Sequence, residues 1–300
     1  MIEGPSSIYL SSSALKNNID FVRARVGENV IISSVVKGNA YGHGIQEFVQ
    51  IARKSGIDHF SVFSADEAYE VVEACNGEAK VMIMGEISHD QLKWAISNNV
   101  EFFVFENSRI IEAIEVAKEL KSVAQIHIEV ETGLNRTGFE ESELKSLIDI
   151  LSKQEEYVSI KGICTHFAGA ESVANHVRVQ KQIKRFNKHY KFLLSKGIKP
   201  ELRHTACSAA AMSYPKTCMD MVRIGILQYG FWPSKETFID YISKVKTPDR
   251  HDPLKRVISW KSSIMSVKHV KTGEFIGYGT SFLAQQDMKI AAVPVGYSHG

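Results

Sequence analysis

The sequence predicts an α/β fold, in which an N-terminal (β/α)8 barrel of the TIM type is followed by a C-terminal β-rich domain. Short β-rich segments alternate with amphipathic helical segments, and eight such strands can be counted before the alternation stops near residue 235. A doubly wound sheet is the alternative fold, but it normally has fewer strands.

Composition indicates a large globular protein. Of its 300 residues, 44% are hydrophobic and 23% charged, and the net charge of +2 predicts neither nucleic acid nor a membrane surface as a partner. No apolar stretch reaches the ~18 residues of a membrane span, and the N-terminus lacks the features of a secretory signal. The four cysteines have neither metal-binding nor disulfide-framework spacing. We therefore expect a cytoplasmic protein without a metal site.

The elements follow one another in a regular order. A first helix is expected to begin after the serines at 11–13 and to end near Gly27, with one apolar face formed by Leu15, Ile19, Phe21, Val22 and Val26. The strands expected after it span residues 31–37, 59–64, 79–85, 100–105, 124–131, 159–167, 202–208 and 219–226. Helices are expected between them at 45–54, 65–74, 90–97, 109–120, 143–153 and 173–195.

The pattern changes in the last quarter of the chain. Residues 235–256 are largely polar and carry two prolines, which predicts a connection without regular structure. The segments 257–270, 274–279 and 288–298 are rich in strand-forming residues. We expect a barrel domain at 1–240 and the start of a β-strand domain at 241–300, incomplete within this length because so few strands enclose little core.

Lys37 is the first candidate for chemistry. It ends the β-branched run of the first strand and is followed by three glycines within residues 38–44, where the backbone can approach a bulky ligand. Partial desolvation lowers the pKa of a lysine and so makes its amine a nucleophile toward an aldehyde. A surface lysine at the end of a strand is the alternative interpretation.

Further candidates stand where the later strands end, which is where barrel enzymes carry their working residues. Arg136 follows the fifth strand, His166 ends the sixth, and Arg223 lies in the eighth. Together with Lys37 they would form a cationic pocket suited to a phosphate or a carboxylate. His166 has the alternative of being an ordinary hydrogen-bonded core histidine.

The loops after strands seven and eight predict a phosphate site. Ser208 opens a short helical segment, and Gly225 and Ile226 offer backbone N–H groups. A lysine that attacks aldehydes, opposite a phosphate cradle, predicts a pyridoxal 5'-phosphate site.

These residues lie in motifs that resemble the alanine racemase family, pyridoxal-phosphate enzymes of fold type III with an N-terminal barrel and a C-terminal β domain. The resemblance covers most of the chain. It rests on five motifs in family order, at residues 36–44 (VKGNAYGHG), 131–139 (ETGLNRTGF), 165–168 (THFA), 221–225 (MVRIG) and 295–297 (VGY).

The resemblance implies two groups that exchange protons with the substrate. Lys37 would hold the cofactor and act on one face of the substrate Cα, and Tyr297, reaching in from the other subunit of a homodimer, would act on the opposite face. A tyrosine with a pKa of ~10 is a poor base near neutrality, so we expect positive charge from His166 or Arg136 to lower it.

The resemblance also implies how the cofactor is held. Arg136 would face the phenolic oxygen of the cofactor and the substrate carboxylate, while His166 would lie beside the ring. Arg223 would contact the pyridine nitrogen, supported from behind by His204. The phosphate would be held by Tyr41, Ser208 and the amides of Gly225 and Ile226.

The chain departs from the family pattern at Glu129. Many members have there a lysine whose carbamate orients the arginine at the position of Arg136. Glu129 supplies a carboxylate on a shorter side chain, and we expect its replacement by Gln to weaken the positioning of Arg136. Cys207, Glu131 and His299 are further departures, which bear on substrate preference more than on the reaction.

The activity implied is the interconversion of L- and D-alanine, which supplies D-alanine for cell-wall peptidoglycan. A racemase of serine or lysine stays open as an alternative. A non-catalytic pyridoxal-phosphate carrier would lack the β domain and Tyr297. A decarboxylase of the same fold normally has an acidic residue at the ring nitrogen, and Arg223 argues against it.

Overall fold

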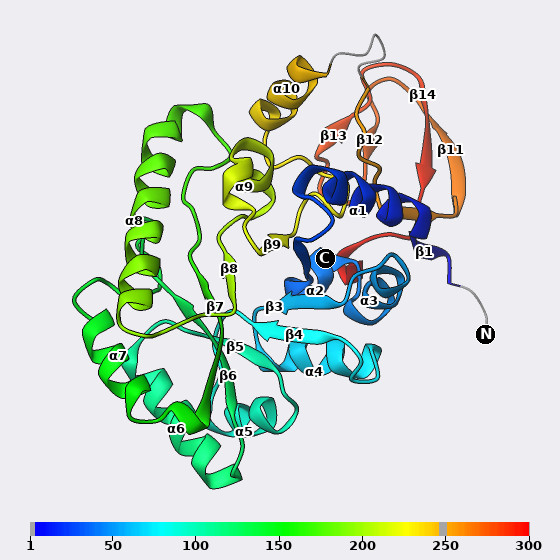
Figure 1. Cartoon of the computed structure of the whole chain (residues 1–300). Helices are drawn as coiled ribbons and strands as arrows, with labels where there is room; N and C mark the ends of the chain where they lie inside the picture. The colour runs from blue at the N-terminus through cyan, green and yellow to red at the C-terminus, as the bar shows by residue number, and fades with distance from the viewer. Residues whose placement is uncertain (1–3, 246–250, 300) are drawn as a thin grey trace. The chain divides into compact units, whose positions relative to one another are not determined.

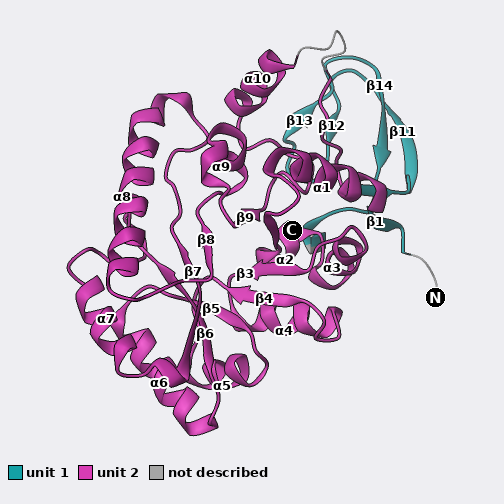
Figure 2. Ribbon diagram, in the orientation of Figure 1, with its two compact units in different colours: residues 1–11, 258–300 teal, residues 12–257 magenta. Residues whose placement is uncertain are grey.

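The protein is described by a computed structural model that covers residues 4–245 and 251–299. It divides into two compact units, one of residues Ser12–Val257 and one of residues Met1–Ser11 with Ile258–Gly300 (Figure 2). The larger unit thus continues beyond residue 240, where we expected the first domain to end. The domain boundary itself stays a prediction.

The larger unit is a barrel of parallel strands surrounded by helices, which confirms the predicted fold class (Figure 1). Its eight strands follow the order β8-β7-β6-β5-β4-β3-β2-β9. They are β2 (Ile31–Val35), β3 (His59–Val62), β4 (Lys80–Ile83), β5 (Glu101–Val104), β6 (Ala124–Glu129), β7 (Val158–Cys164), β8 (Leu202–His204) and β9 (Met221–Ile224). The ring closes between β8 and β9, where Cys207 and Arg223 form a parallel bridge.

Helices cover the outside of the ring. They are α1 (Ser12–Val26), α3 (Ile45–Lys54), α4 (Ala65–Ala74), α5 (His89–Ser97), α6 (Asn107–Leu120), α7 (Leu144–Ser152), α8 (His176–Ser195) and α9 (Ser208–Ser213). In α3, Ile45, Phe48, Val49 and Ala52 are buried, the spacing of one helical face. Among the described residues, no helix is both long and apolar enough to span a membrane.

All the predicted strands are present, but each ends earlier than expected. The predicted first strand reached Lys37, whereas β2 ends at Val35; the predicted sixth reached residue 167, whereas β7 ends at Cys164. The polar residues after each apolar run leave the strand ladder and enter the loops at the rim. Lys37, Arg136 and His166 therefore lie just beyond the strand ends, whereas Arg223 stays within β9.

The expectation of an irregular connection at 235–256 was wrong in its first half, because α10 (Lys235–Lys244) forms there. Its start is a capping box, in which the Ser234 hydroxyl accepts from the Thr237 amide and the Thr237 hydroxyl accepts from the Ser234 amide. Its Tyr241 ring then packs edge-on against Phe21 of α1, 5.4 Å between ring centroids. These apolar contacts outweigh the polar composition. Residues 246–250 of the expected connection lie outside the described residues.

The smaller unit consists of antiparallel strand pairs. β1 (Ser6–Leu10) pairs with β10 (Ile258–Ser262), and β11 (Ser266–Val270) pairs with β14 (Met288–Ala292). A short pair, β12 (Phe275–Ile276) with β13 (Phe282–Leu283), completes it. The strand-rich character predicted for this region is confirmed, whereas β1 at the beginning of the chain was not foreseen.

The capping box predicts the effect of one substitution. Ser234→Ala removes the acceptor for the Thr237 amide and should lower the free energy of unfolding by about 1 kcal/mol in urea denaturation. Ser243→Ala is the control, because its hydroxyl donates to the Asp240 carbonyl within the same helix without capping it; it should change stability by less than ~0.5 kcal/mol. Equal losses in the two variants would contradict the role of the cap.

Candidate functional site

Lys37 is half-buried at the start of a left-handed turn, the segment α2 (Lys37–Gly42). The φ angles of Gly38, Asn39, Ala40 and Tyr41 are 62°, 52°, 52° and 54°. Left-handed conformation costs a non-glycine residue about 1–2 kcal/mol. Three such residues in succession mark a strained segment beside the lysine, and strain of this kind gathers at functional sites.

Hydrogen bonds from neighbouring elements hold this turn. The Glu67 carboxylate of α4 accepts from the backbone amide of Gly38. The Asn39 side chain accepts from the Ile45 amide at 3.0 Å and so caps α3. Just before the lysine, the Val35 carbonyl accepts from the Gln228 amide group at 3.0 Å and from the Tyr229 hydroxyl at 2.9 Å. Lys37 is therefore fixed from both sides.

The residues predicted to hold a phosphate come together next to this turn. The Ser208 hydroxyl accepts from the Gly225 amide at 3.1 Å. A Cβ atom at Gly225 would lie 2.8 Å from the Tyr41 hydroxyl oxygen, so the glycine permits the close approach of that hydroxyl. Ile226 follows at the beginning of the turn 226–230. Two hydroxyls and a loop of backbone amides are donors that suit a phosphate.

Arg136 lies on the loop that follows β6. The ends of this loop are joined by the Val130–Phe139 bridge, and the Glu131 carboxylate accepts from the backbone amides of Gly133 and Asn135. The Arg136 side chain is exposed, while its neighbour Thr137 donates its hydroxyl to Glu129 at 2.8 Å. The loop backbone is thus fixed while the guanidinium is open to a ligand.

Three cations act on His166. Burial, together with repulsion from Arg223, Arg136 and Lys37, lowers the pKa of His166 to about 3. The imidazole is therefore neutral near neutral pH, so the positive charge expected from His166 or Arg136 is not supplied by His166. Arg223, Arg136 and Lys37 are thus near enough to His166 to act on it electrostatically.

Glu129 is the carboxylate of this cationic region. It ends β6 with 3% of its surface exposed, and burial raises its pKa although Thr137, Arg223 and Arg136 act in the opposite direction. A carboxylate here lies within electrostatic reach of both arginines.

Arg223 projects from β9 into the barrel, with 5% of its surface exposed. One terminal nitrogen donates to His204 Nδ1 and to the His204 carbonyl, each at 2.7 Å, and the other donates to the Thr165 carbonyl at 2.8 Å. His204 thus contacts the Arg223 guanidinium directly, and its role as a support for a cofactor-binding arginine stays a prediction.

Tyr297 belongs to the smaller unit. It opens a short 3₁₀ turn (Tyr297–His299), and its side chain is fully exposed. Its action opposite Lys37 stays a prediction.

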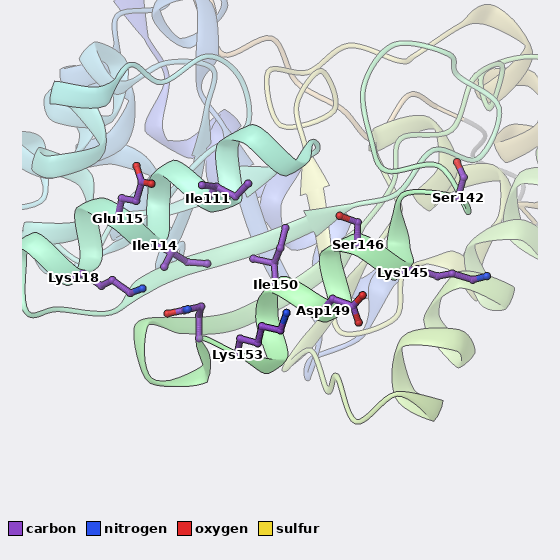
Figure 3. A pocket seen from close by; sticks show the side chains of 11 residues that line it. Ile111, Ile114, Glu115, Lys118, Ser142, Lys145, Ser146, Asp149, Ile150 and Lys153 are labelled. Carbon is purple, nitrogen blue, oxygen red and sulfur yellow. The ribbon is translucent and has the colours of Figure 1, made fainter.

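A cavity of about 540 Å³ lies elsewhere, between α6 and α7 (Figure 3). Ile114 and Ile150 form its apolar part, and charged side chains such as Lys118 and Asp149 surround them. It contains none of the predicted site residues.

Comparison with known proteins identifies the family of this chain. Residues 10–233 match the family model of the alanine racemase N-terminal domain, and residues 257–300 match that of the C-terminal domain. The chain belongs to the alanine racemase family. It is 32% identical over 299 residues to an alanine racemase of Leptospira interrogans, covering 98% of this chain and 74% of that protein.

Solved structures of the family extend the similarity to three dimensions. An alanine racemase of Clostridium difficile 630 superposes with a TM-score of 0.87 at 28% identity, covering 99% of this chain and 75% of that one. A histidine racemase of Leuconostoc mesenteroides superposes with a TM-score of 0.85 at 25% identity, covering 99% and 76%.

Sequence reasoning missed the polar groups inside this alanine racemase family barrel. Glu101, His127 and His59 are each at most 3% exposed and hydrogen-bonded to one another or to neighbouring side chains. A signal was present, because each is a polar residue within a predicted strand, two residues from another position on the same side of that strand. We had interpreted those strands only as apolar runs.

Gly138 allows a test of the loop that carries Arg136. Its φ is 115°, and an added Cβ would lie 2.7 Å from the Glu131 amide nitrogen, so Gly138→Ala must displace the loop. We expect a loss of about 2–4 kcal/mol in the free energy of unfolding, measured in urea.

Gly197→Ala is the matched control, because Gly197 has a φ of 84° with nothing within 4 Å of an added Cβ. It bears only the backbone cost of about 1 kcal/mol. If both variants lost the same stability, the close approach at Gly138 would not be the cause.

Proposed function

We propose that this protein interconverts L- and D-alanine with pyridoxal 5'-phosphate as its cofactor. As a member of the alanine racemase family it is an isomerase. The observation that carries the proposal is the grouping of Lys37, Arg136 and Arg223 around the neutral His166, beside the hydroxyls of Tyr41 and Ser208. This set combines an amine, cations for carboxylate or phosphate, and phosphate donors.

The residues present fit pyridoxal phosphate. Gly225 lacks the Cβ that would fill the space against the Tyr41 hydroxyl, and Ser208 is buried with its hydroxyl at the Gly225 amide. Tyr41, Ser208, Gly225 and Ile226 would bind the phosphate, and Lys37 would bind the aldehyde carbon. When bound, the cofactor supplies an electron sink that makes the α-proton of an amino acid acidic.

The chain then supplies proton transfer and positioning. Racemisation removes the α-proton from one face and returns a proton to the other, so two groups on opposite faces are required. We assign Lys37 Nζ to one face and the Tyr297 hydroxyl of a partner subunit to the other. Arg136 would bind the substrate carboxylate.

Arg223 would favour racemisation over competing reactions. A guanidinium does not give up its proton, so Arg223, if it held the pyridine nitrogen, would leave the ring less electron-withdrawing than an acidic residue would. Protonation at positions other than the substrate Cα would then be disfavoured. This supports a racemase over a decarboxylase or a transaminase.

Alanine is the proposed substrate because the relatives that match most of the chain are named alanine racemases. The product D-alanine would serve cell-wall peptidoglycan, and the enzyme would work in the cytoplasm as a homodimer with shared active sites. Assays should include serine and lysine, and also histidine, because one structural neighbour is a histidine racemase.

Lys37 is tested by two substitutions. Lys37→Ala and Lys37→Arg should both abolish the visible absorbance of bound pyridoxal phosphate and the exchange of the alanine α-proton in deuterated water, because neither side chain bonds covalently to the aldehyde. Lys37→Arg is the control for charge. Absorbance and exchange surviving in either variant would overturn the assignment.

We expect Glu129 to lower the stability of the folded state while it positions Arg136. Its pKa is raised above the ordinary 4.5, so ionisation destabilises the folded state as pH rises through the raised pKa. Glu129→Gln should therefore unfold at a higher temperature than the wild type at pH ~8, with the difference vanishing toward pH ~4. It should also raise the KM for alanine, because Arg136 loses its nearby carboxylate.

Glu131→Gln is the control, two residues along the loop. Its carboxylate accepts from two backbone amides, and an amide group can accept only through its single oxygen. It should lower the unfolding temperature at both pH values. A Glu129→Gln variant that is less stable than wild type at pH ~8, or that has an unchanged KM, would contradict the role given to Glu129.

A further inference from the structure

The barrel interior beneath the site holds a line of four hydrogen-bonded polar side chains, one from each of four strands. Glu101 Oε2 lies 2.7 Å from His127 Nε2, and His127 Nδ1 lies 2.8 Å from His204 Nε2. His204 Nδ1 lies 2.7 Å from a terminal nitrogen of Arg223. The exposed fractions are 3% for Glu101, 0% for both histidines and 5% for Arg223.

The arginine determines the direction of every hydrogen bond in this line. A guanidinium has only donors, so His204 Nδ1 must accept, and the hydrogen of a neutral His204 must lie on Nε2. His127 Nδ1 then accepts that hydrogen, and His127 Nε2–H donates to the Glu101 carboxylate. If His204 were protonated on both nitrogens, its Nδ1–H would face an N–H of the Arg223 guanidinium, and neither group could accept. A single arrangement of hydrogens therefore satisfies the whole line.

The charge states agree with this arrangement. Burial raises the pKa of Glu101, but hydrogen bonds from His127 and His59 outweigh it and hold the pKa well below its usual range. Burial lowers the pKa of both His127 and His204. The line thus joins a buried carboxylate to a buried guanidinium through two neutral imidazoles.

Such a line is an unusual way to fill a barrel. Burying two charges is costly, and replacing buried ion pairs with apolar side chains is often neutral or stabilising. The neighbouring interior positions are filled in the ordinary way by Met82, Phe103, Cys164 and Met221. A carboxylate placed two imidazoles away balances the arginine charge without contacting the guanidinium, which keeps N–H groups for a ligand.

We propose that Glu101 and His127 are positioning residues for Arg223: they hold His204 in its Nε2–H form, and His204 holds the guanidinium in one orientation. The target of Arg223, the pyridine nitrogen of the cofactor, rests on the proposed function. The order of hydrogens in the line is independent of the proposed function. Glu101 and His127, near the base of the barrel, thus affect the orientation of Arg223 at its rim.

The first test uses the wild-type chain as purified, with ¹⁵N-labelled histidine. Nitrogen chemical shifts should show His127 and His204 as neutral imidazoles with hydrogen on Nε2, unchanged between pH ~6 and ~9. Hydrogen on Nδ1 of either residue, or titration of either one in this range, would overturn the proposal. This measurement needs neither activity nor a substitution.

The second test compares His127→Phe with His59→Phe. Both histidines are buried neighbours of Glu101, but His59 bonds to Ser33 at 2.8 Å and lies outside the line to Arg223. His127→Phe removes the acceptor for His204 Nε2–H. It should shift the His204 nitrogen signals and lower kcat about 10–100-fold, the usual cost of losing a supporting partner, with a much smaller change in KM.

His59→Phe should leave the His204 signals unchanged and kcat within about twofold, although it also removes a buried hydrogen-bonded imidazole. Equal changes of kcat and of the His204 signals in the two variants would show that these side chains only pack the core, and this would overturn the proposal. If the wild-type chain lacked racemase activity, the proposed function would fail. The His204 nitrogen signals would still show whether the proposed order of hydrogens in the line is correct.

Discussion

The buried guanidinium of Arg223 is the interaction on which much of the barrel depends. The ladder between β8 and β9 is reduced to the Cys207–Arg223 bridge, so the ring is weakest there. Arg223 donates from its backbone amide to Ala206 at 2.9 Å and from its side chain to the carbonyls of His204 and Thr165. Because a buried donor without a partner is costly, these carbonyls and the arginine hold three strands together.

The same residue joins the base of the barrel to its rim. Its side chain is balanced from below by Glu101 through two imidazoles, and from beside by Glu129, whose pKa reflects both arginines. Two buried carboxylates, Glu101 near the base and Glu129 at the end of β6, thus balance part of the positive charge of Lys37, Arg136 and Arg223. His166 stays neutral in this surrounding and adds no further positive charge.

Strain and support are paired at the turn that follows Lys37. Three non-glycine residues adopt positive φ there, and the backbone is held by the Glu67 carboxylate at the Gly38 amide and by the Asn39 side chain at the Ile45 amide. The loop of Arg136 has the same design, with the Glu131 carboxylate as its internal support. In both cases a carboxylate holds the backbone beside a cationic side chain.

Several features followed from the sequence alone. The barrel strands and outer helices were predictable because apolar periodicity is local, and the candidates at the strand ends were predictable because parallel strands all end at one rim. Lys37, His166, Arg223 and Ser208 became candidates in this way, and their roles stay predictions. The early strand ends were not predictable in this way. Nor was the helix α10, because its formation depends on a capping box and on aromatic contacts with α1.

Only the tertiary structure decided how the charges are arranged. Glu101, His127 and His204 are separated in sequence by 26 and 77 residues and become neighbours only when the barrel closes. The neutral state of His166 likewise arises from cations on three other segments and from burial. Periodicity records which side of a strand a residue faces, whereas a pKa or a hydrogen-bond direction depends on groups that the fold brings from elsewhere.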